Sequence, residues 1–182
     1  MASRFKALTW AVCFSVLSPS AAYASKEGWA TASDVGAYSL MAISLGLPVI
    51  EKDKNGALQA LGSFGAASLV TEGLKQAFPT LRPDGSDRKS FPSGHTSRSF
   101  AAAATLWERQ GPIVGISAMV VAGLVGTARI KADKHRFSEV AVGAAIGLAS
   151  GILITNRKPG SQSALVPWGD MSGGGIAFAK RF

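Results

Sequence analysis

The chain has 182 residues, which is enough for one domain with a hydrophobic core and too few for two. It is 47% hydrophobic, only 16% charged and has 21 glycines, a composition between those of soluble and membrane domains. Its net charge of +8 predicts an anionic partner. Nucleic acid is the disfavoured choice, because the basic residues flank two short stretches and aromatic residues do not interleave with them.

Residues 1–24 have the pattern of a secretory signal peptide. Arg4 and Lys6 give a basic start, an apolar run follows, and a small-x-small cleavage site ends at Ala24. We expect cleavage there; the alternative is an uncleaved first membrane helix. The only cysteine, Cys13, lies inside this segment, so the mature chain would have neither a disulfide nor a thiol nucleophile.

The rest of the chain predicts an all-α bundle of about five helices. They are expected at about 35–50, 57–78, 94–107, 113–128 and 138–155. Pro79 ends the second helix, because proline cannot continue one. The tail is irregular, with a short strand pattern at 175–182. We therefore divide the chain into a signal peptide (1–24), a helical domain (25–159) and a C-terminal tail (160–182).

The glycine pattern bears on the environment of the bundle. Gly143, Gly147 and Gly151 are four apart, a spacing that lets helix backbones approach closely and is common in membranes. Soluble bundles also pack tightly, and several segments are shorter than the roughly 20 apolar residues of a spanning helix. The third helix begins with the polar run 96–99 and is expected in the bundle interior. We expect a membrane-embedded bundle.

Alternation of the helices predicts which loops share an end. The loops within 75–92 and 129–139 fall at one end of the bundle. The opposite end carries Lys52, Lys54, Arg109, Arg157 and Lys158. Positive charge marks the cytoplasmic side of a membrane protein, so the first end is expected to face the periplasm. This agrees with the export signal and predicts an inner-membrane protein, or a periplasmic one if the bundle is soluble.

Both histidines of the chain, His95 and His135, lie at this first end. His135 precedes Glu139 by four residues, so the carboxylate can hold one ring nitrogen and leave the other free to attack. His95 follows Ser93 and Gly94 at a helix start, where Ser93 can cap the helix and backbone amides attract an anion. Each pattern alone also occurs as ordinary helix capping or as a surface pair.

A group of basic residues accompanies the histidines. Lys75 ends a helix and Arg82 lies in the loop beyond it, a point charge and a planar fork that together suit phosphate oxygens. Arg129 stands six residues before His135. A lysine at a helix end is common for electrostatic reasons alone, so the inference depends on the whole set.

The order Lys-x6-Arg-Pro, Pro-Ser-Gly-His and Arg-x5-His-x3-acid resembles the type 2 phosphatidic acid phosphatase family, which shares its fold with the vanadium haloperoxidases. These motifs cover residues 75–139. The helix pattern over about 35–155 is similar to the helical bundle of that family. The combined pattern is specific, whereas no single motif is.

The resemblance implies a role for each residue. His135 would be the nucleophile, Glu139 would orient it, and His95 would protonate the leaving oxygen. The residues implied to hold the phosphate oxygens are Lys75, Arg82, Ser93, Gly94 and Arg129. No metal and no cofactor is implied, because these cations already stabilise the charge of phosphoryl transfer. The chain departs from the family at Glu139, usually aspartate, and at Ala128, usually serine. We still expect activity, because neither departure removes a charged group.

The expected activity is that of a phosphoric monoester hydrolase of the lipid phosphate phosphatase type. It would cleave a phosphate ester or diphosphate of a membrane lipid on the periplasmic side, through a phosphohistidine. One alternative is a soluble periplasmic acid phosphatase of broad specificity, and another is a catalytically impaired member that binds phospholipids. A haloperoxidase is disfavoured, since nothing in the sequence selects halide. The expected partners are a phosphorylated lipid or small phosphate ester and membrane lipid, with no nucleic acid and no protein partner.

Overall fold

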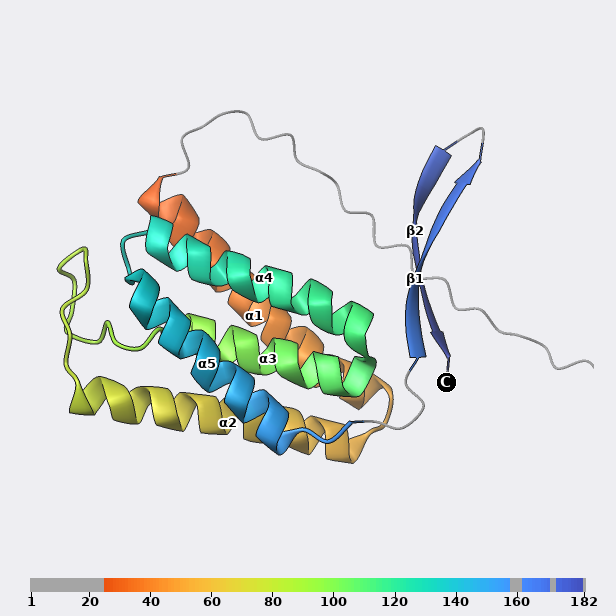
Figure 1. The fold of residues 1–182 in the computed structure, drawn as a ribbon, viewed down its shortest axis with the longest axis horizontal. Coiled ribbons are helices and arrows are strands. Elements are labelled where there is room, and N and C mark those ends of the chain that lie inside the picture. Colours follow the sequence, from red (N-terminus) through yellow and green to blue (C-terminus); the bar gives the residue numbers. More distant parts are fainter. Residues whose placement is uncertain (1–24, 158–161, 171–172, 182) are drawn as a thin grey trace, which may run out of the picture.

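The computed structural model describes residues 25–157, 162–170 and 173–181, with side chains for the first of these ranges. The predicted signal peptide and its cleavage site lie outside the described residues. The elements are α1 (Lys26–Ile50), α2 (Lys54–Ala77), α3 (Gly94–Gln110), α4 (Pro112–Lys131), α5 (Phe137–Ile154), β1 (Gln162–Asp170) and β2 (Gly173–Arg181). The five-helix bundle is confirmed (Figure 1), and the expected C-terminal strand is one half of an antiparallel hairpin.

Helix α1 begins nine residues before the expected start at residue 35, so that boundary was wrong. The Ser25 hydroxyl accepts a hydrogen bond from the Gly28 amide at 3.0 Å and caps the helix. The first turns contain polar residues, which hid the helix from a search for apolar periodicity. As a result, Ser33 and Asp34 lie on α1 rather than before it.

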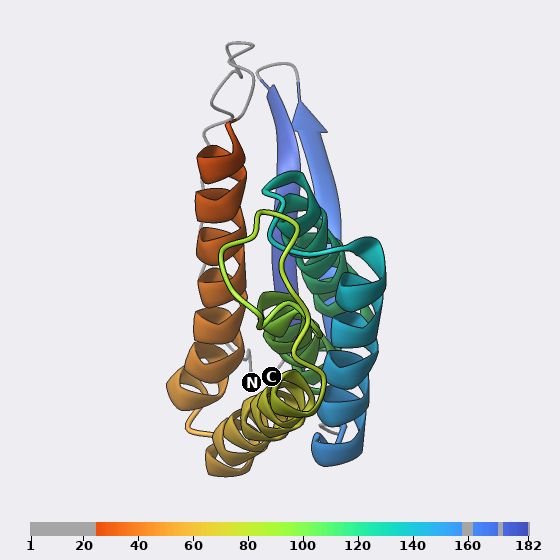
Figure 2. The same ribbon diagram turned by 90° about the vertical axis from the view of Figure 1, so that its left-hand side faces the viewer.

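Helix α3 occupies the centre of the bundle, as its polar start predicted. It packs against all four other helices, and Figure 2 shows them around it. Its alanines 101–104 are at most 1% exposed, and Ser97, Ser99 and Thr105 are buried with them. Small side chains on the central helix allow its neighbours to approach closely.

The three spaced glycines lie where α5 meets α3. A Cβ atom at Gly143 would come within 2.6 Å of the Ser93 carbonyl oxygen, and one at Gly147 within 2.8 Å of the Phe100 Cβ. Gly151 likewise faces Ala104. The glycines therefore allow α5 to lie directly on α3.

Helices α1, α4 and α5 are long and apolar enough to cross a membrane. Large apolar side chains are exposed around the outside of the bundle, among them Val35, Ile43, Leu69, Val120, Leu124, Phe137 and Leu153. A soluble monomer rarely exposes so many large apolar side chains, whereas in a membrane lipid covers them. The described bundle is thus built as a membrane-embedded one.

The helices alternate in direction, so the loops 78–93 and 132–136 lie together at the left end of Figure 1, beside the start of α1. The turns after α1 and α3 lie at the other end. There Arg109 is paired with Asp53 and donates a hydrogen bond to the Asn156 carbonyl at 3.1 Å. This contact joins the ends of α2, α3 and α5.

The close contact between α3 and α5 predicts that alanine substitution has different effects on stability at two glycines of apolar helices. Gly147→Ala should destabilise the protein by about 1–3 kcal/mol, because its Cβ has no room against α3. Gly123→Ala on α4 meets nothing within 4 Å and should be neutral or stabilising by about 0.5–1 kcal/mol. Thermal unfolding of both variants in the same detergent measures the difference. Equal melting temperatures would contradict the packing described here.

Candidate active site

The two loops at the left end of Figure 1 are bonded to one another, and Figure 2 looks onto them. The Asp84 amide donates to the Asp133 carbonyl at 3.1 Å, and Lys134 Nζ lies 2.5 Å from Asp84 Oδ2. Arg136 Nη1 donates to the Leu81 carbonyl at 3.0 Å. These contacts bring the loop that carries Arg82 against the loop that carries His135.

His135 and Glu139 form a buried pair, with Nδ1 of the histidine 3.2 Å from Oε2 of the glutamate. The same oxygen accepts hydrogen bonds from Ser90 Oγ at 2.5 Å and the Arg136 amide at 3.1 Å. An ionised carboxylate only accepts, so Nδ1 of His135 carries the hydrogen and Nε2 keeps its lone pair. His135 itself lies in the loop before α5 and not on the helix.

The longer side chain of Glu139 does not prevent this contact. Glu139 is the third residue of α5, and its carboxylate turns back toward the residues before the helix. There its Oε1 also accepts from Arg136 Nη1 at 3.1 Å. The glutamate thus reaches His135 from a position that the helix start fixes.

The environment of His135 favours the neutral form of its imidazole. Burial lowers its pKa below the usual value, and the charges of Arg82, Arg129 and Lys75 lower it further. The hydrogen bond to Glu139 opposes them without reversing the direction. A neutral imidazole with a free nitrogen is the form that can act as a nucleophile.

His95 lies in the first turn of α3, and its side chain is 22% exposed. Its Nε2 is 2.9 Å from Asp34 Oδ1, and the Tyr38 ring contacts it edge-on with centroids 6.2 Å apart. Burial lowers the pKa of His95, as does the charge of Arg129, while Asp34 raises it. The second histidine therefore also has a carboxylate partner, which comes from α1.

Two of the predicted phosphate-binding residues already have partners. Lys75 is 8% exposed, and its Nζ donates to the Lys89 and Pro92 carbonyls, each at 2.6 Å. An ammonium has three N–H donors, so one is left for a ligand. Arg82 Nε donates to Asp87 Oδ1 at 2.7 Å, which leaves the Nη groups of the arginine fork. Lys75 thus also holds the loop that leads into α3.

Arg129 is 6% exposed and is held from α1. Its Nη1 donates to Ser33 Oγ at 3.2 Å and to Asp34 Oδ1 at 3.4 Å. Its Nε is buried and has no hydrogen-bond partner within the part of the chain that the structure describes. An unpaired buried donor on a cation is costly, and an anionic ligand would supply the missing acceptor.

The predicted side-chain cap of α3 by Ser93 was wrong. Ser93 is the N-cap residue, but its hydroxyl pairs with Thr96 Oγ1 at 2.9 Å and makes no cap hydrogen bond. Its amide donates to the Glu139 carbonyl at 3.0 Å, which ties the start of α3 to α5. Gly94 is buried in the first turn, where amides lack helical acceptors.

A family model described as the PAP2 superfamily matches residues 56–162, more than half of the chain. The chain belongs to the PAP2 superfamily. The resemblance read from the three motifs is thereby confirmed.

Two curated relatives are similar to this PAP2 protein. It is 38% identical over 97 residues to a lipid A 1-phosphatase of Porphyromonas gingivalis, covering 52% of this chain and 22% of that protein. It is 29% identical over 124 residues to a lipid A 4'-phosphatase of Helicobacter pylori, covering 60% of this chain and 63% of that protein. The chain thus spans less than two thirds of the length of either relative.

Two crystal structures have a similar fold. Aquifex aeolicus LpxE aligns with a TM-score of 0.61 at 23% identity, covering 70% of this chain and 83% of that one. A PAP2 type phosphatidylglycerolphosphate phosphatase of Bacillus subtilis, described as transmembrane, aligns with a TM-score of 0.57 at 27% identity. That match covers 71% of this chain and 74% of the other.

Several residues at the site were not found from the PAP2 motifs. They are Ser33, Asp34, Tyr38, Ser90 and Arg98. Asp34 could have been noticed in the sequence, because it is an acidic residue directly before an apolar segment. It was missed because the helix was expected to start after it. Ser90 had no signal in the sequence, because its contact with Glu139 depends on how the loop folds.

The electrostatics of the site predict how the two histidines titrate. Both should titrate below about 6.5, the ordinary value, because burial and neighbouring cations disfavour the imidazolium. Glu139→Gln should lower the pKa of His135 further, since it removes the partner that favours the charged form. Imidazole NMR titration measures both, and His95→Gln assigns the two signals. A value above 6.5 for His135 would contradict this account.

Proposed function

We propose that this PAP2 protein is a phosphatase that removes a phosphate group from a membrane lipid through a phosphohistidine intermediate. The observation that carries the proposal is the buried His135–Glu139 pair, which leaves Nε2 of His135 unprotonated. Around it lie Lys75, Arg82 and Arg129, whose charges reach the imidazole. A nucleophile among cations suits an anionic phosphate ester.

In the first step, the lone pair of His135 Nε2 forms a bond to phosphorus as the bond to the leaving lipid oxygen breaks. Protonated His95 gives its proton to that oxygen, so the lipid leaves as an alcohol. In the second step, His95, now neutral, takes a proton from water, and the oxygen of that water displaces His135 from phosphorus. Inorganic phosphate leaves, and both histidines return to their initial states.

The basic residues bind the phosphate and stabilise its charge as it is transferred. The free Arg129 Nε, the Nη groups of Arg82 and the third N–H of Lys75 are the donors that a phosphate would satisfy. Backbone amides of Gly94 and the helix start can add to them, whereas Ser93 offers only its hydroxyl, already shared with Thr96. The negative charge of the bound phosphate would raise the pKa of His95, so that His95 is protonated when the substrate is in place.

A lipid substrate follows from where the site lies. It is at one end of a bundle whose outer helices expose large apolar side chains. A phosphorylated head group at a membrane surface can enter there while its chains stay in the bilayer. The two curated relatives are lipid A phosphatases, so we propose a phosphate on a lipid A type head group as the substrate to test first.

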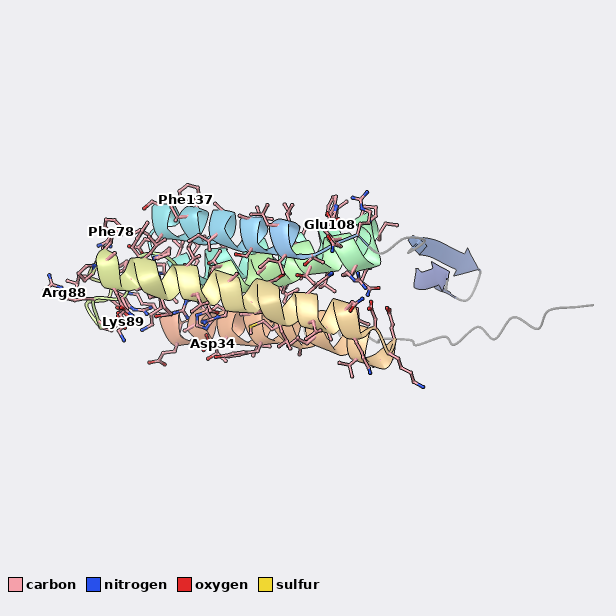
Figure 3. All side chains as sticks on the ribbon, turned by 90° about the horizontal axis from the view of Figure 1, so that it is seen from below. Asp34, Phe78, Arg88, Lys89, Glu108 and Phe137 are labelled. Carbon is pink, nitrogen blue, oxygen red and sulfur yellow. The ribbon has the colours of Figure 1, made fainter. Side chains whose placement is uncertain are left out.

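The nucleophile is tested by substitution. His135→Gln should abolish phosphate release from lipid A or phosphatidic acid in mixed micelles, together with any acid-labile phosphoenzyme. Glu108→Gln is the matched control, because Glu108 lies at the opposite end of the bundle (Figure 3) and should keep full activity. Phosphate release at the wild-type rate from His135→Gln would rule out the proposed intermediate.

We further propose that the site faces the periplasm, because the opposite end carries the basic residues expected on the cytoplasmic side. Ser86 and Asn55 are exposed at the two ends. In a Cys13→Ser background, Ser86→Cys should react with an impermeant thiol reagent on intact spheroplasts, and Asn55→Cys only after lysis. Reaction of Asn55→Cys alone would invert the orientation, and reaction of both would favour the soluble alternative.

A further inference from the structure

Helix α1 brings a carboxylate to the site that the family motifs do not contain. Asp34 Oδ1 lies 2.9 Å from Nε2 of His95 and 3.4 Å from Nη1 of Arg129. Ser33, the preceding residue, accepts from the same Arg129 nitrogen at 3.2 Å. One oxygen of Asp34 therefore joins a histidine on α3 to an arginine on α4, and Figure 3 labels the residue on α1.

The other charged groups that face His95 are all cations. Arg98 comes from α3 itself, Arg129 from α4 and Arg82 from the loop after α2. Tyr38, one turn beyond Asp34 on α1, contributes an aromatic edge. Among the described residues, Asp34 supplies the negative charge that acts on this imidazole.

We propose that Asp34 is a positioning residue, whose carboxylate holds Nε2 of His95 so that Nδ1 is the nitrogen that exchanges a proton with the substrate. The proposal rests on the proposed phosphatase function and adds a residue to it. Each histidine would then have one ring nitrogen beside a carboxylate and would react through the other. For His135 these are Nδ1, held by Glu139, and Nε2, which attacks.

The proton transfers fit this arrangement. When His95 is protonated, both ring nitrogens carry hydrogen, and Nε2 is the nitrogen that lies 2.9 Å from Asp34 Oδ1. In the proposed step Nδ1 gives its proton to the leaving oxygen, and the neutral ring keeps its remaining hydrogen on Nε2, the nitrogen beside Asp34. In the second step Nδ1 takes the proton from water. The charge of Asp34 favours the imidazolium, which the charges of Arg129, Arg98 and Arg82 disfavour.

A competing interpretation is that Asp34 fills the anion site. Its side chain is 47% exposed, and its carboxylate touches an arginine that a phosphate would use. In that case phosphate would have to displace it. Removing the charge would then strengthen phosphate binding without slowing the chemical step, the opposite of what a positioning residue predicts.

The test compares Asp34→Asn, Asp34→Glu and Glu27→Gln. Asp34→Asn should lower kcat by about 10- to 100-fold at neutral pH, part of the effect of a general acid, with little change in KM. The alkaline limb of its kcat profile should move to lower pH, because His95 loses its proton more easily without the carboxylate. Asp34→Glu should restore the limb in part. Glu27→Gln removes an exposed carboxylate from the same helix and should leave both parameters unchanged.

A second measurement does not depend on activity. In a His135→Gln background, imidazole NMR should show that Asp34→Asn lowers the pKa of His95 while Glu27→Gln does not. The proposal would be overturned if Asp34→Asn left the pKa of His95 unchanged. It would also be overturned if that variant had an unchanged kcat with a lower KM and tighter inhibition by inorganic phosphate. If the wild type released no phosphate from any lipid, the phosphatase function would fail, and the NMR comparison would still decide whether Asp34 acts on His95.

Discussion

The contacts of the buried Glu139 carboxylate hold the site together. One of its oxygens accepts hydrogen bonds from Ser90 in the loop before α3, from the Arg136 amide at the start of α5, and from His135 in the loop between α4 and α5. A buried carboxylate must be hydrogen-bonded, because its desolvation is otherwise too costly. The need to satisfy one charge thus forces the two motif-bearing loops into a single arrangement. His135 is oriented by the same contacts that close the end of the bundle.

The bundle makes this arrangement possible by keeping α3 central and narrow. Its buried alanines and serines allow the other helices to approach, and Gly143 lets α5 lie against the Ser93 carbonyl. Since Ser93 is also bonded through its amide to Glu139, the starts of α3 and α5 are held in register. His95 and His135 stand at those two starts. Small residues along α3 and α5 therefore determine how far apart His95 and His135 lie.

Features that depend on local sequence could be predicted, and those that depend on tertiary contacts could not. Apolar segments and Pro79 predicted the helix boundaries to within a few residues except at the start of α1, and the motifs pointed to His95, His135 and Glu139. The start of α1 was missed because capping by Ser25, and not apolar periodicity, determines it. That error removed Asp34 from consideration. Ser90 was missed for another reason, since only the folded loop brings it to Glu139.

The protonation of the two histidines also depends on burial and on neighbouring charges. Each histidine lies beside one carboxylate, and burial together with the surrounding arginines lowers the pKa of both imidazoles, which favours their neutral form. The cations of the site outnumber its carboxylates even when Asp87, which pairs with Arg82, is counted with Glu139 and Asp34. The site, with Lys75, Arg82, Arg98 and Arg129, therefore has an excess of positive charge. A phosphate monoester, with a charge of about −1.5 to −2 at neutral pH, offsets that excess. In the proposed mechanism its arrival would favour the protonated form of His95, while His135, held through Nδ1, would still present a lone pair. On the proposed mechanism, the charge of the substrate makes one histidine the acid and the other the nucleophile, although their surroundings are similar.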